Sequence, residues 1–362
     1  RTASGAPDRR TPGAAGAVGL RNRTWKEDPM DTPAVILPAF LDEGVPVEDR
    51  KDLSLQLLVG QALGLTCWTP RFVYDDTGAN ANICTMDRAA RERVFRAGRK
   101  AGFRIACIGT AVGKVKLTDA DDGNKAPYRS HEDHMRELDA AIETARLAGA
   151  LFLRAFSFYP PLGSDVEDYY AQARDRLGDM VRRCEEAGIV YLMEPEPNLV
   201  GSDARRMLRL CEDIGSDHLL INPDAANMHV QGYDAFEEYR LVAEAGRLGY
   251  MHVKDYTEPC PRAITVDEEA LRHFGSVDVG LAGHERIFRD LAGRLPAIDR
   301  KLKGLGADGL VLDVEGHMKG GGQFGGWSGP DGLGVAVRAL TALLDDCAIP
   351  YRIRRYPDVE KK

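Results

Sequence analysis

Eight short apolar runs alternate along the chain with longer segments of helical spacing. The runs cover residues 34–40, 65–74, 104–110, 151–157, 189–194, 219–224, 250–254 and 310–315. Short apolar and β-branched runs are typical of strands that are buried on both faces, and strands that alternate with helices form a parallel sheet. Eight such strand–helix pairs predict a (β/α)8 TIM barrel, an α/β fold in which the sheet closes on itself.

An open doubly wound sheet is the alternative arrangement. A dinucleotide-binding sheet of that kind carries a G-x-G-x-x-G motif directly after its first strand. Residues 39–44 of this chain read AFLDEG instead. The barrel is therefore preferred, and the main support for hydride transfer with a nicotinamide cofactor is missing.

Capping residues and glycines mark the ends of several predicted helices. Ser130 followed by Asp133 predicts the start of one helix, and Gly149 predicts its end. Further helices are expected over residues 169–187, 203–214, 235–245 and 332–344. The long segments 254–281 and 319–332 follow the seventh and eighth strands, and unusually long loops tend to be functional.

The first 30 residues differ in charge from the rest of the chain. They hold six basic and three acidic residues, whereas the whole chain has a formal net charge of −8. The segment is rich in Gly, Ala, Pro and Arg and lacks the apolar stretch of a secretory signal. Because it has too few large apolar residues to pack, residues 1–30 are predicted to be a disordered extension. Residues 31–362 are predicted to form the barrel as a single domain.

Composition excludes two classes of partner. No apolar run approaches the roughly 20 residues that span a bilayer, so no membrane interaction is expected. The net charge of −8 repels a phosphate backbone, so no nucleic-acid ligand is expected. The seven cysteines are odd in number and form no C-x-x-C pair, which favours a reducing, cytoplasmic compartment.

Four consecutive runs carry residues that bind metal ions. The fifth run ends at Glu194, the sixth ends at Asp224, the seventh contains His252 and the eighth ends at Glu315. The carboxyl ends of barrel strands meet on one face, so these side chains are expected to converge. One imidazole and three carboxylates suit Mn²⁺, Mg²⁺, Co²⁺ or Zn²⁺. Glu196 competes with Glu194 for the ligand position, and we prefer Glu194 because it directly follows the apolar run.

Several short motifs together resemble a known family. They are IGTAVGK at 108–114, LRAFS at 153–157, MEPEP at 193–197, DAAN at 224–227, HVKD at 252–255 and DVEGH at 313–317. Over residues 33–362 the chain is similar to the xylose isomerase-like barrels that include sugar phosphate isomerases and epimerases. The resemblance implies that one divalent metal ion, with manganese favoured, is bound by Glu194, Asp224, His252 and Glu315. It also implies that Glu194 and Glu315 move protons at the substrate carbons.

Three functions are consistent with such a site. The first is a metal-dependent isomerase or epimerase of a sugar, keto-sugar or polyol, in which proton abstraction beside a carbonyl gives a metal-stabilised enediolate. The alternative is a lyase or dehydratase that begins in the same way and eliminates from a 3-keto-glycoside, as in C-glycoside deglycosylation. The third is a binding barrel without catalysis, which has no physical need for four intact ligands. The nucleases of the same superfamily carry further histidines where this chain has Asn227, which disfavours that activity.

Other polar residues near the strand ends are candidates for contact with a substrate. His317 is a candidate acid or base, and the substrate-binding candidates are Lys114, Arg154, Glu196, Asn227, His229, Lys254 and Trp327. The structural alternatives are a solvated lysine for Lys114, an ion pair for Arg154, loop-backbone hydrogen bonds for the histidines and core packing for Trp327. The helix-surface histidines are expected to be His131, His134 and His273. The expected partner is a small-molecule carbohydrate, with a homo-oligomer or a small accessory subunit as a further hypothesis.

Overall fold

Each of the eight apolar runs contains a parallel strand in the computed structural model, which describes residues 33–45, 50–74, 80–263, 270–316 and 329–354. In ring order the strands are β1 (Val35–Ile36), β2 (Cys67–Trp68), β5 (Arg104–Ile105) with β6 (Cys107–Gly109), β7 (Phe152–Ala155), β8 (Val190–Met193), β9 (Leu219–Ile221), β10 (Met251–Val253) and β13 (Leu312–Val314). The strands β6 to β9 pair in parallel register, as do β2 with β5 and β10 with β13.

The ring closes between its first and last strands. Parallel bridges join Ile36 to Val311 and Ala39 to Val314. On the other side of β1, the amide of Thr69 donates to the carbonyl oxygen of Ala39 at 3.2 Å. An open doubly wound sheet has free edges at these positions. The prediction of a closed TIM barrel is therefore confirmed.

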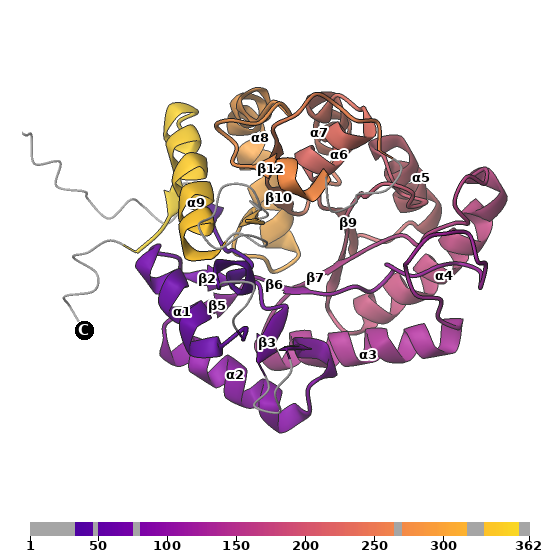
Figure 1. The fold of residues 1–362 in the computed structure, drawn as a ribbon, viewed down its shortest axis with the longest axis horizontal. Helices are drawn as coiled ribbons and strands as arrows, with labels where there is room; N and C mark the ends of the chain where they lie inside the picture. Colours follow the sequence, from indigo (N-terminus) through magenta and orange to yellow (C-terminus); the bar gives the residue numbers. More distant parts are fainter. Residues whose placement is uncertain (1–32, 46–49, 75–79, 264–269, 317–328, 355–362) are drawn as a thin grey trace, which may run out of the picture. The chain divides into compact units, whose positions relative to one another are not determined.

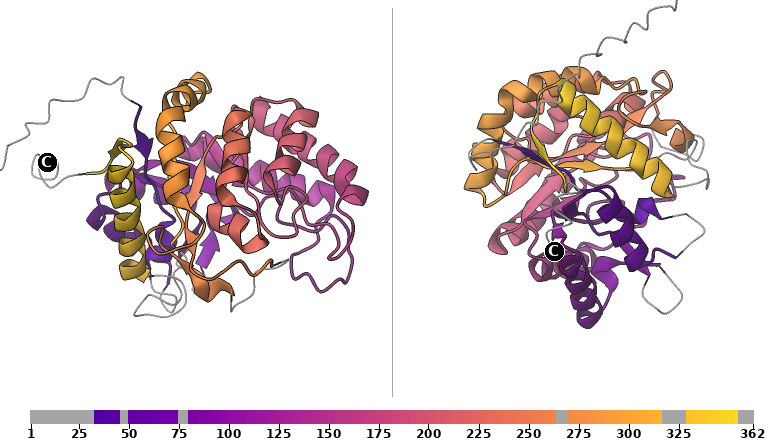
Figure 2. Two further views of the ribbon diagram at one scale, coloured as in Figure 1. Left: turned by 90° about the horizontal axis from the view of Figure 1, so that it is seen from above. Right: turned by 90° about the vertical axis from the view of Figure 1, so that its left-hand side faces the viewer.

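Helices surround this ring in chain order (Figure 1). They are α1 (Leu53–Ala62), α2 (Arg88–Lys100), α3 (His131–Ala148), α4 (Glu167–Glu186), α5 (Ala204–Ile214), α6 (Ala225–Gln231), α7 (Ala235–Glu244), α8 (His284–Gly304) and α9 (Gly329–Asp346). Both views in Figure 2 show the helices outside and the strands enclosed by them. Where helices cover the sheet, strand residues are buried whichever way they point: all four residues of β8 have no exposed surface.

The capping signals read from the sequence act as predicted. Helix α3 begins after Ser130, whose hydroxyl oxygen accepts from the amide of Asp133 at 3.1 Å. It ends at Gly149, whose φ of 74° is accessible to glycine without a steric penalty. Asp203 caps α5 in the same way through the amide of Arg206 at 3.0 Å. Local chemistry thus sets where these helices start and stop.

Two antiparallel hairpins depart from the simple barrel. The single strand predicted over residues 65–74 is wrong, because β3 (Phe72–Tyr74) leaves the barrel and pairs with β4 (Asn80–Asn82). Pro70 lies between β2 and β3 and has no amide to donate to a ladder. A second hairpin, β11 (Asp255–Tyr256) with β12 (Phe274–Gly275), follows β10. A further short strand, β14 (Tyr351–Arg352), pairs with β1.

The barrel residues form one compact unit, Pro33–Lys362. The disordered extension predicted for residues 1–30 lies outside the described residues and stays a prediction. Among the described helices, none combines the length and apolar character that crossing a membrane requires.

Candidate functional site

Four strand ends bring three carboxylates and one imidazole together. Glu194 follows β8, Asp224 follows β9, His252 lies within β10 and Glu315 follows β13. One ligand atom from each of the four lies within 4.8 Å of the others, and all four residues are buried. These are the residues that the sequence placed at one face of the barrel. We refer to them as the acidic cluster.

The imidazole of His252 points its Nδ1 atom at all three carboxylates. Nδ1 lies 3.2 Å from Glu194 Oε1, 3.7 Å from Glu315 Oε2 and 3.9 Å from Asp224 Oδ2. Within the described part of the chain, both ring nitrogens and Glu194 Oε2 are buried without a hydrogen bond. Buried polar atoms are nearly always bonded. An imidazole nitrogen and carboxylate oxygens at this spacing fit a divalent metal ion, which the cluster could hold.

Two cations balance part of the charge of the acidic cluster. Lys254 Nζ lies 3.0 Å from Asp224 Oδ2 and 2.5 Å from Glu315 Oε2, and burial alone would lower its pKa, but the two carboxylates raise that pKa well above its usual value. Arg154 Nε lies 3.4 Å from Glu194 Oε2. Burial would raise the pKa of Glu194, yet His252 and Arg154 outweigh it and lower that pKa to about 2. Glu194 is therefore ionised at neutral pH.

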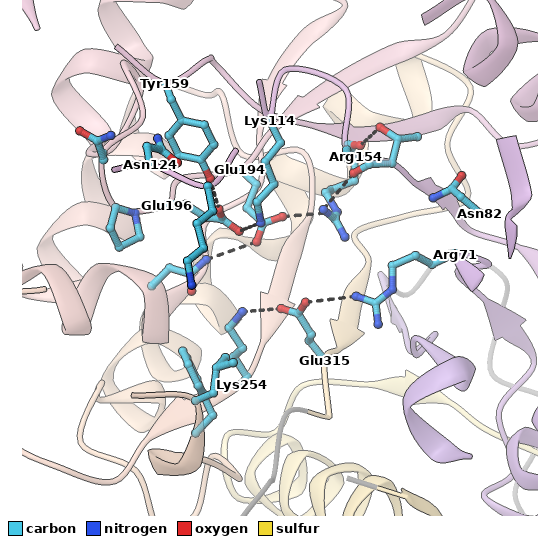
Figure 3. A pocket seen from close by; sticks show the side chains of 18 of the residues that line it. Arg71, Asn82, Lys114, Asn124, Arg154, Tyr159, Glu194, Glu196, Lys254 and Glu315 are labelled. Carbon is cyan, nitrogen blue, oxygen red and sulfur yellow. Dashed lines mark hydrogen bonds and ion pairs between the residues drawn. The ribbon is translucent and has the colours of Figure 1, made fainter. Parts of the chain in front are cut away.

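A cavity of about 560 Å³ opens above the acidic cluster (Figure 3). Glu194 and Glu315 lie in its wall, and so do the predicted substrate contacts, namely Lys114, Arg154, Glu196, Asn227 and Lys254. Leu271 and Phe274, from the long segment after β10, close another part of the wall. The cavity thus joins the cluster to most of the polar residues that the sequence singled out.

One candidate within the described residues is not brought to the cavity. His229 is not among its lining residues; its Nε2 lies 3.0 Å from the carbonyl oxygen of Glu258, and its ring lies beside Tyr256. This loop-backbone contact is the structural alternative expected from the sequence. His317 and Trp327 lie outside the described residues, and so does most of the glycine-rich segment 319–332.

Glu196 stands apart from the acidic cluster. The ammonium group of Lys114 donates to Glu196 Oε1 at 2.6 Å, and the hydroxyl of Tyr159 donates to Glu196 Oε2 at 2.9 Å. Burial and the Glu196 charge raise the pKa of Tyr159 well above its usual value, so its hydroxyl stays protonated. Figure 3 shows Lys114 and Tyr159 converging on Glu196. Of the two competing glutamates, it is Glu194 that faces His252.

Asn227 fixes the segment that carries both glutamates. Its side-chain amide donates to Glu194 Oε1 at 3.3 Å and to the carbonyl oxygen of Pro195 at 3.0 Å. Its own backbone amide donates to Asp224 Oδ1 at 2.9 Å, which makes Asp224 the N-cap of α6. One oxygen of Asp224 thus caps a helix while the other faces the acidic cluster.

Arg71 was missed as a site residue. Its guanidinium group bonds Asp42 at 2.9 Å and Glu43 at 2.7 Å, and NH1 lies 3.9 Å from Glu315 Oε1. It also lines the cavity and lies over the ring of Phe40. Asp42 and Glu43 follow Leu41, the residue after the first apolar run, and Arg71 follows Pro70 after the second strand. The strand-end rule, applied to the early strands, would have found them.

The surface position expected for His134 is wrong. His134 is 2% exposed, and its Nε2 accepts from the amide of Gly113 at 2.8 Å. Gly113 has a φ of +80°, and a Cβ there would lie 2.0 Å from the carbonyl oxygen of Phe156. Only glycine fits this turn, which places Lys114 beside Glu196. Helix α3 therefore contributes to the cavity wall from behind.

Comparisons with known proteins agree with this architecture. The sequence profile of the family described as xylose isomerase-like TIM barrel matches residues 60–327. No curated protein sequence matches the chain. Solved structures match over most of their length, although their low identities show the fold alone.

Three of these solved structures show the variety of proteins that share the fold. The IolI protein with a bound zinc atom is 13% identical with a TM-score of 0.60, covering 86% of this chain and 99% of its own. The probable 3-DHS dehydratase AsbF from Bacillus anthracis is 12% identical with a TM-score of 0.60, and the match covers 85% of this chain and 98% of AsbF. An L-ribulose 3-epimerase is 15% identical with a TM-score of 0.57, and the match covers 87% of this chain and 96% of the epimerase. The fold, the acidic cluster and the profile match lead to one conclusion: the chain belongs to the xylose isomerase-like TIM barrel family.

Proposed function

We propose that the chain is a divalent-metal-dependent isomerase or epimerase of a small sugar, keto-sugar or polyol. The observation that carries this proposal is the buried acidic cluster of Glu194, Asp224, His252 and Glu315, two of whose carboxylates, Glu194 and Glu315, line a cavity. Three carboxylates buried together are costly unless a cation joins them. The mixed nitrogen and oxygen donor set suits several divalent ions, and we take Mn²⁺ as our first choice among them.

The two cavity-lining glutamates of the cluster would move the proton. Glu194 and Glu315 follow β8 and β13, with β9 and β10 between them in the ring, so they approach a bound substrate from different strands. A proton taken from carbon by one carboxylate and returned by the other inverts that carbon. A divalent ion in the cluster would polarise the substrate carbonyl and stabilise the enediolate charge. Lys254 keeps Glu315 and Asp224 oriented through its contacts at 2.5 and 3.0 Å.

Solvent exchange tests the proposal directly. Mn²⁺-loaded protein is incubated in D₂O with L-ribulose, D-tagatose and a 3-keto-glucoside, and proton NMR follows the hydrogen beside each carbonyl. We expect deuterium at that carbon in the substrate and in an epimer or isomer. Glu315→Gln should remove the exchange. The absence of exchange with every keto-sugar tested would contradict the proposal.

Metal content provides the matched structural test. His252→Ala removes the only imidazole of the acidic cluster, whereas His131→Ala removes a histidine that is partly exposed on α3. Elemental analysis should find about one divalent ion per chain in the wild type and in His131→Ala, and a large loss in His252→Ala. Equal metal content in all three proteins would show that the ion does not bind here.

A second candidate is elimination from a 3-keto-glycoside. The cavity volume of about 560 Å³ favours it, because it leaves room for a group attached to the sugar. A cluster glutamate would take the proton at C2, the C1–O bond would break, and the aglycone would leave with the bonding electrons. A 3-keto-glucoside of p-nitrophenol separates the two candidates. Release of p-nitrophenol supports elimination, and deuterated epimer without release supports epimerisation.

A further inference from the structure

The cations that line the cavity are already paired with carboxylates, with one exception. Arg71 pairs with Asp42 and Glu43, Arg154 with Glu194, Lys254 with Asp224 and Glu315, and Lys114 with Glu196. The exception in the described part of the wall is Lys125, an exposed lysine without such a pair. Away from Lys125, a phosphate or carboxylate group on a substrate would have to compete with a carboxylate of the chain for one of these paired cations.

Among the described residues, the carboxylates in the ion pairs around the cavity outnumber the cations. Ion pairs shorter than 4.0 Å join six carboxylates, those of Asp42, Glu43, Glu194, Glu196, Asp224 and Glu315, to four cations, those of Arg71, Lys114, Arg154 and Lys254. His252 is neutral when it binds a metal. These carboxylates outnumber the paired cations by two, which favours a divalent ion there. A neutral substrate adds no charge to these pairs, whereas a phosphate adds negative charge to a partly desolvated site that already holds more carboxylates than paired cations.

Glu196 is oriented and has acceptor capacity to spare. Lys114 occupies one site on Oε1 and Tyr159 one site on Oε2, whereas a carboxylate offers about four acceptor sites. Glu196 lines the cavity with its side chain 19% exposed. Its position is fixed from behind, because Asn227 holds the carbonyl oxygen of Pro195 at 3.0 Å. The carboxylate of Glu196 is therefore placed to accept a hydrogen bond from a substrate hydroxyl, and its negative charge repels an anionic group.

We infer that Glu196, oriented by Lys114 and Tyr159, accepts a hydrogen bond from a hydroxyl group of an uncharged keto-sugar or polyol, and that it selects against a phosphate in that part of the cavity. This inference rests on the proposed function, since the acidic cluster holds the carbonyl end of the same substrate. It makes Glu196 a specificity-determining residue that acts away from the metal ion.

Calorimetric binding to the Mn²⁺-loaded full chain tests the inference. The ligands are L-ribulose, L-ribulose 5-phosphate, D-tagatose and D-tagatose 6-phosphate. The wild type should bind each uncharged ketose on the order of tenfold more tightly than its phosphate. Glu196→Gln should weaken the uncharged ketoses about tenfold, because a hydrogen bond to a charged acceptor is lost, and should narrow the preference against phosphate. Tyr159→Phe should act in the same direction with a smaller loss.

Controls separate a specific effect from a folding defect. Manganese stoichiometry should be unchanged in Glu196→Gln and Tyr159→Phe, because neither residue is in the acidic cluster. Lys100→Gln, at an exposed lysine in the last turn of α2 outside the cavity, should leave binding of the uncharged ketoses unchanged. Tighter binding of the phosphates by the wild type, binding of none of the four ligands, or unchanged affinities in Glu196→Gln would each overturn the inference. Loss of D₂O exchange with the binding preferences intact would instead count against the proposed function alone.

Discussion

Lys254→Met is the substitution whose effect can be worked out furthest. Lys254 is 6% exposed and its ammonium group lies between Asp224 and Glu315, at 3.0 and 2.5 Å. Methionine keeps most of the apolar length of the side chain, but it removes the charge and the contact of the ammonium group with the ring of Phe274. Two buried carboxylates then lose a shared cation. Breaking a buried ion pair from one side typically costs about 3–5 kcal/mol.

The loss of stability in Lys254→Met should depend on whether a metal ion is present. In EDTA the variant should unfold at a temperature about 6–10 °C below the wild type, given about 2 °C per kcal/mol for a chain of this size. With saturating Mn²⁺ the gap should narrow, because the more negative site attracts the ion more strongly and ligand binding stabilises the folded state. The Mn²⁺-induced rise in Tm should therefore be larger in Lys254→Met than in the wild type.

Thermal unfolding followed by circular dichroism, with EDTA and with Mn²⁺, measures both effects. Lys100→Met is the matched control, because Lys100 is exposed in the last turn of α2. It should change the unfolding temperature by no more than about 2 °C under either condition. Equal unfolding temperatures of Lys254→Met and wild type in EDTA would refute the reasoning, and so would a gap that widens with Mn²⁺.

Three further predictions follow from other contacts. Burial alone would lower the pKa of His252, but Glu194 raises that pKa above its usual value of 6.5. A proton therefore competes with the metal ion for His252 up to a higher pH. The Mn²⁺ affinity, measured by calorimetry, should fall about tenfold per pH unit below the pKa of His252 and level off above it. A pH-independent affinity would contradict this. Gly113→Ala should destabilise the fold much more than Gly123→Ala in urea unfolding: both glycines have a positive φ, but a Cβ meets a carbonyl oxygen at 2.0 Å only at Gly113. Similar losses of stability in the two variants would contradict the close contact at Gly113. Asp203→Ala should cost about 1 kcal/mol in the same assay, because α5 loses its cap, and a neutral change would exclude that role.

The barrel and the acidic cluster could be predicted because both depend on short-range patterns. Each strand is a local apolar run, and in a parallel barrel every strand end lies on the same face. Glu194, Asp224 and Glu315 directly follow such runs, so their convergence needs no knowledge of the loops. The family profile and the solved structures support the same fold.

What the sequence did not reveal depends on contacts between distant segments. His134 lies on a helix with charged neighbours and looks exposed, yet it is buried because the Gly113 turn, 21 residues earlier, packs its amide against the imidazole. Arg71 forms ion pairs with Asp42 and Glu43 only because the ends of the first two strands are neighbours in the closed ring. The antiparallel pairing of β3 with β4 likewise depends on how the chain leaves the barrel after Pro70.

The separation of roles between Glu194 and Glu196 also depends on such contacts. The two side chains are two residues apart and chemically identical, so spacing alone cannot assign one to the acidic cluster and the other to the cavity wall. Asn227 makes the difference, since it holds both Glu194 Oε1 and the carbonyl oxygen of Pro195. Glu194 then faces His252 at 3.2 Å, while Glu196 meets Lys114 at 2.6 Å.

The pairing of cations with the buried carboxylates bears on how the site forms. Three carboxylates around one imidazole would repel one another strongly if nothing else lay near them. Lys254 and Arg154 relieve that repulsion from within the chain, through contacts at 2.5 to 3.4 Å. We therefore expect the cluster to assemble without a metal ion, with its ligands in place before the ion binds. Wild-type protein stripped with EDTA should accordingly retain its far-ultraviolet circular dichroism and its cooperative unfolding transition, and a loss of either would show that the two cations are insufficient.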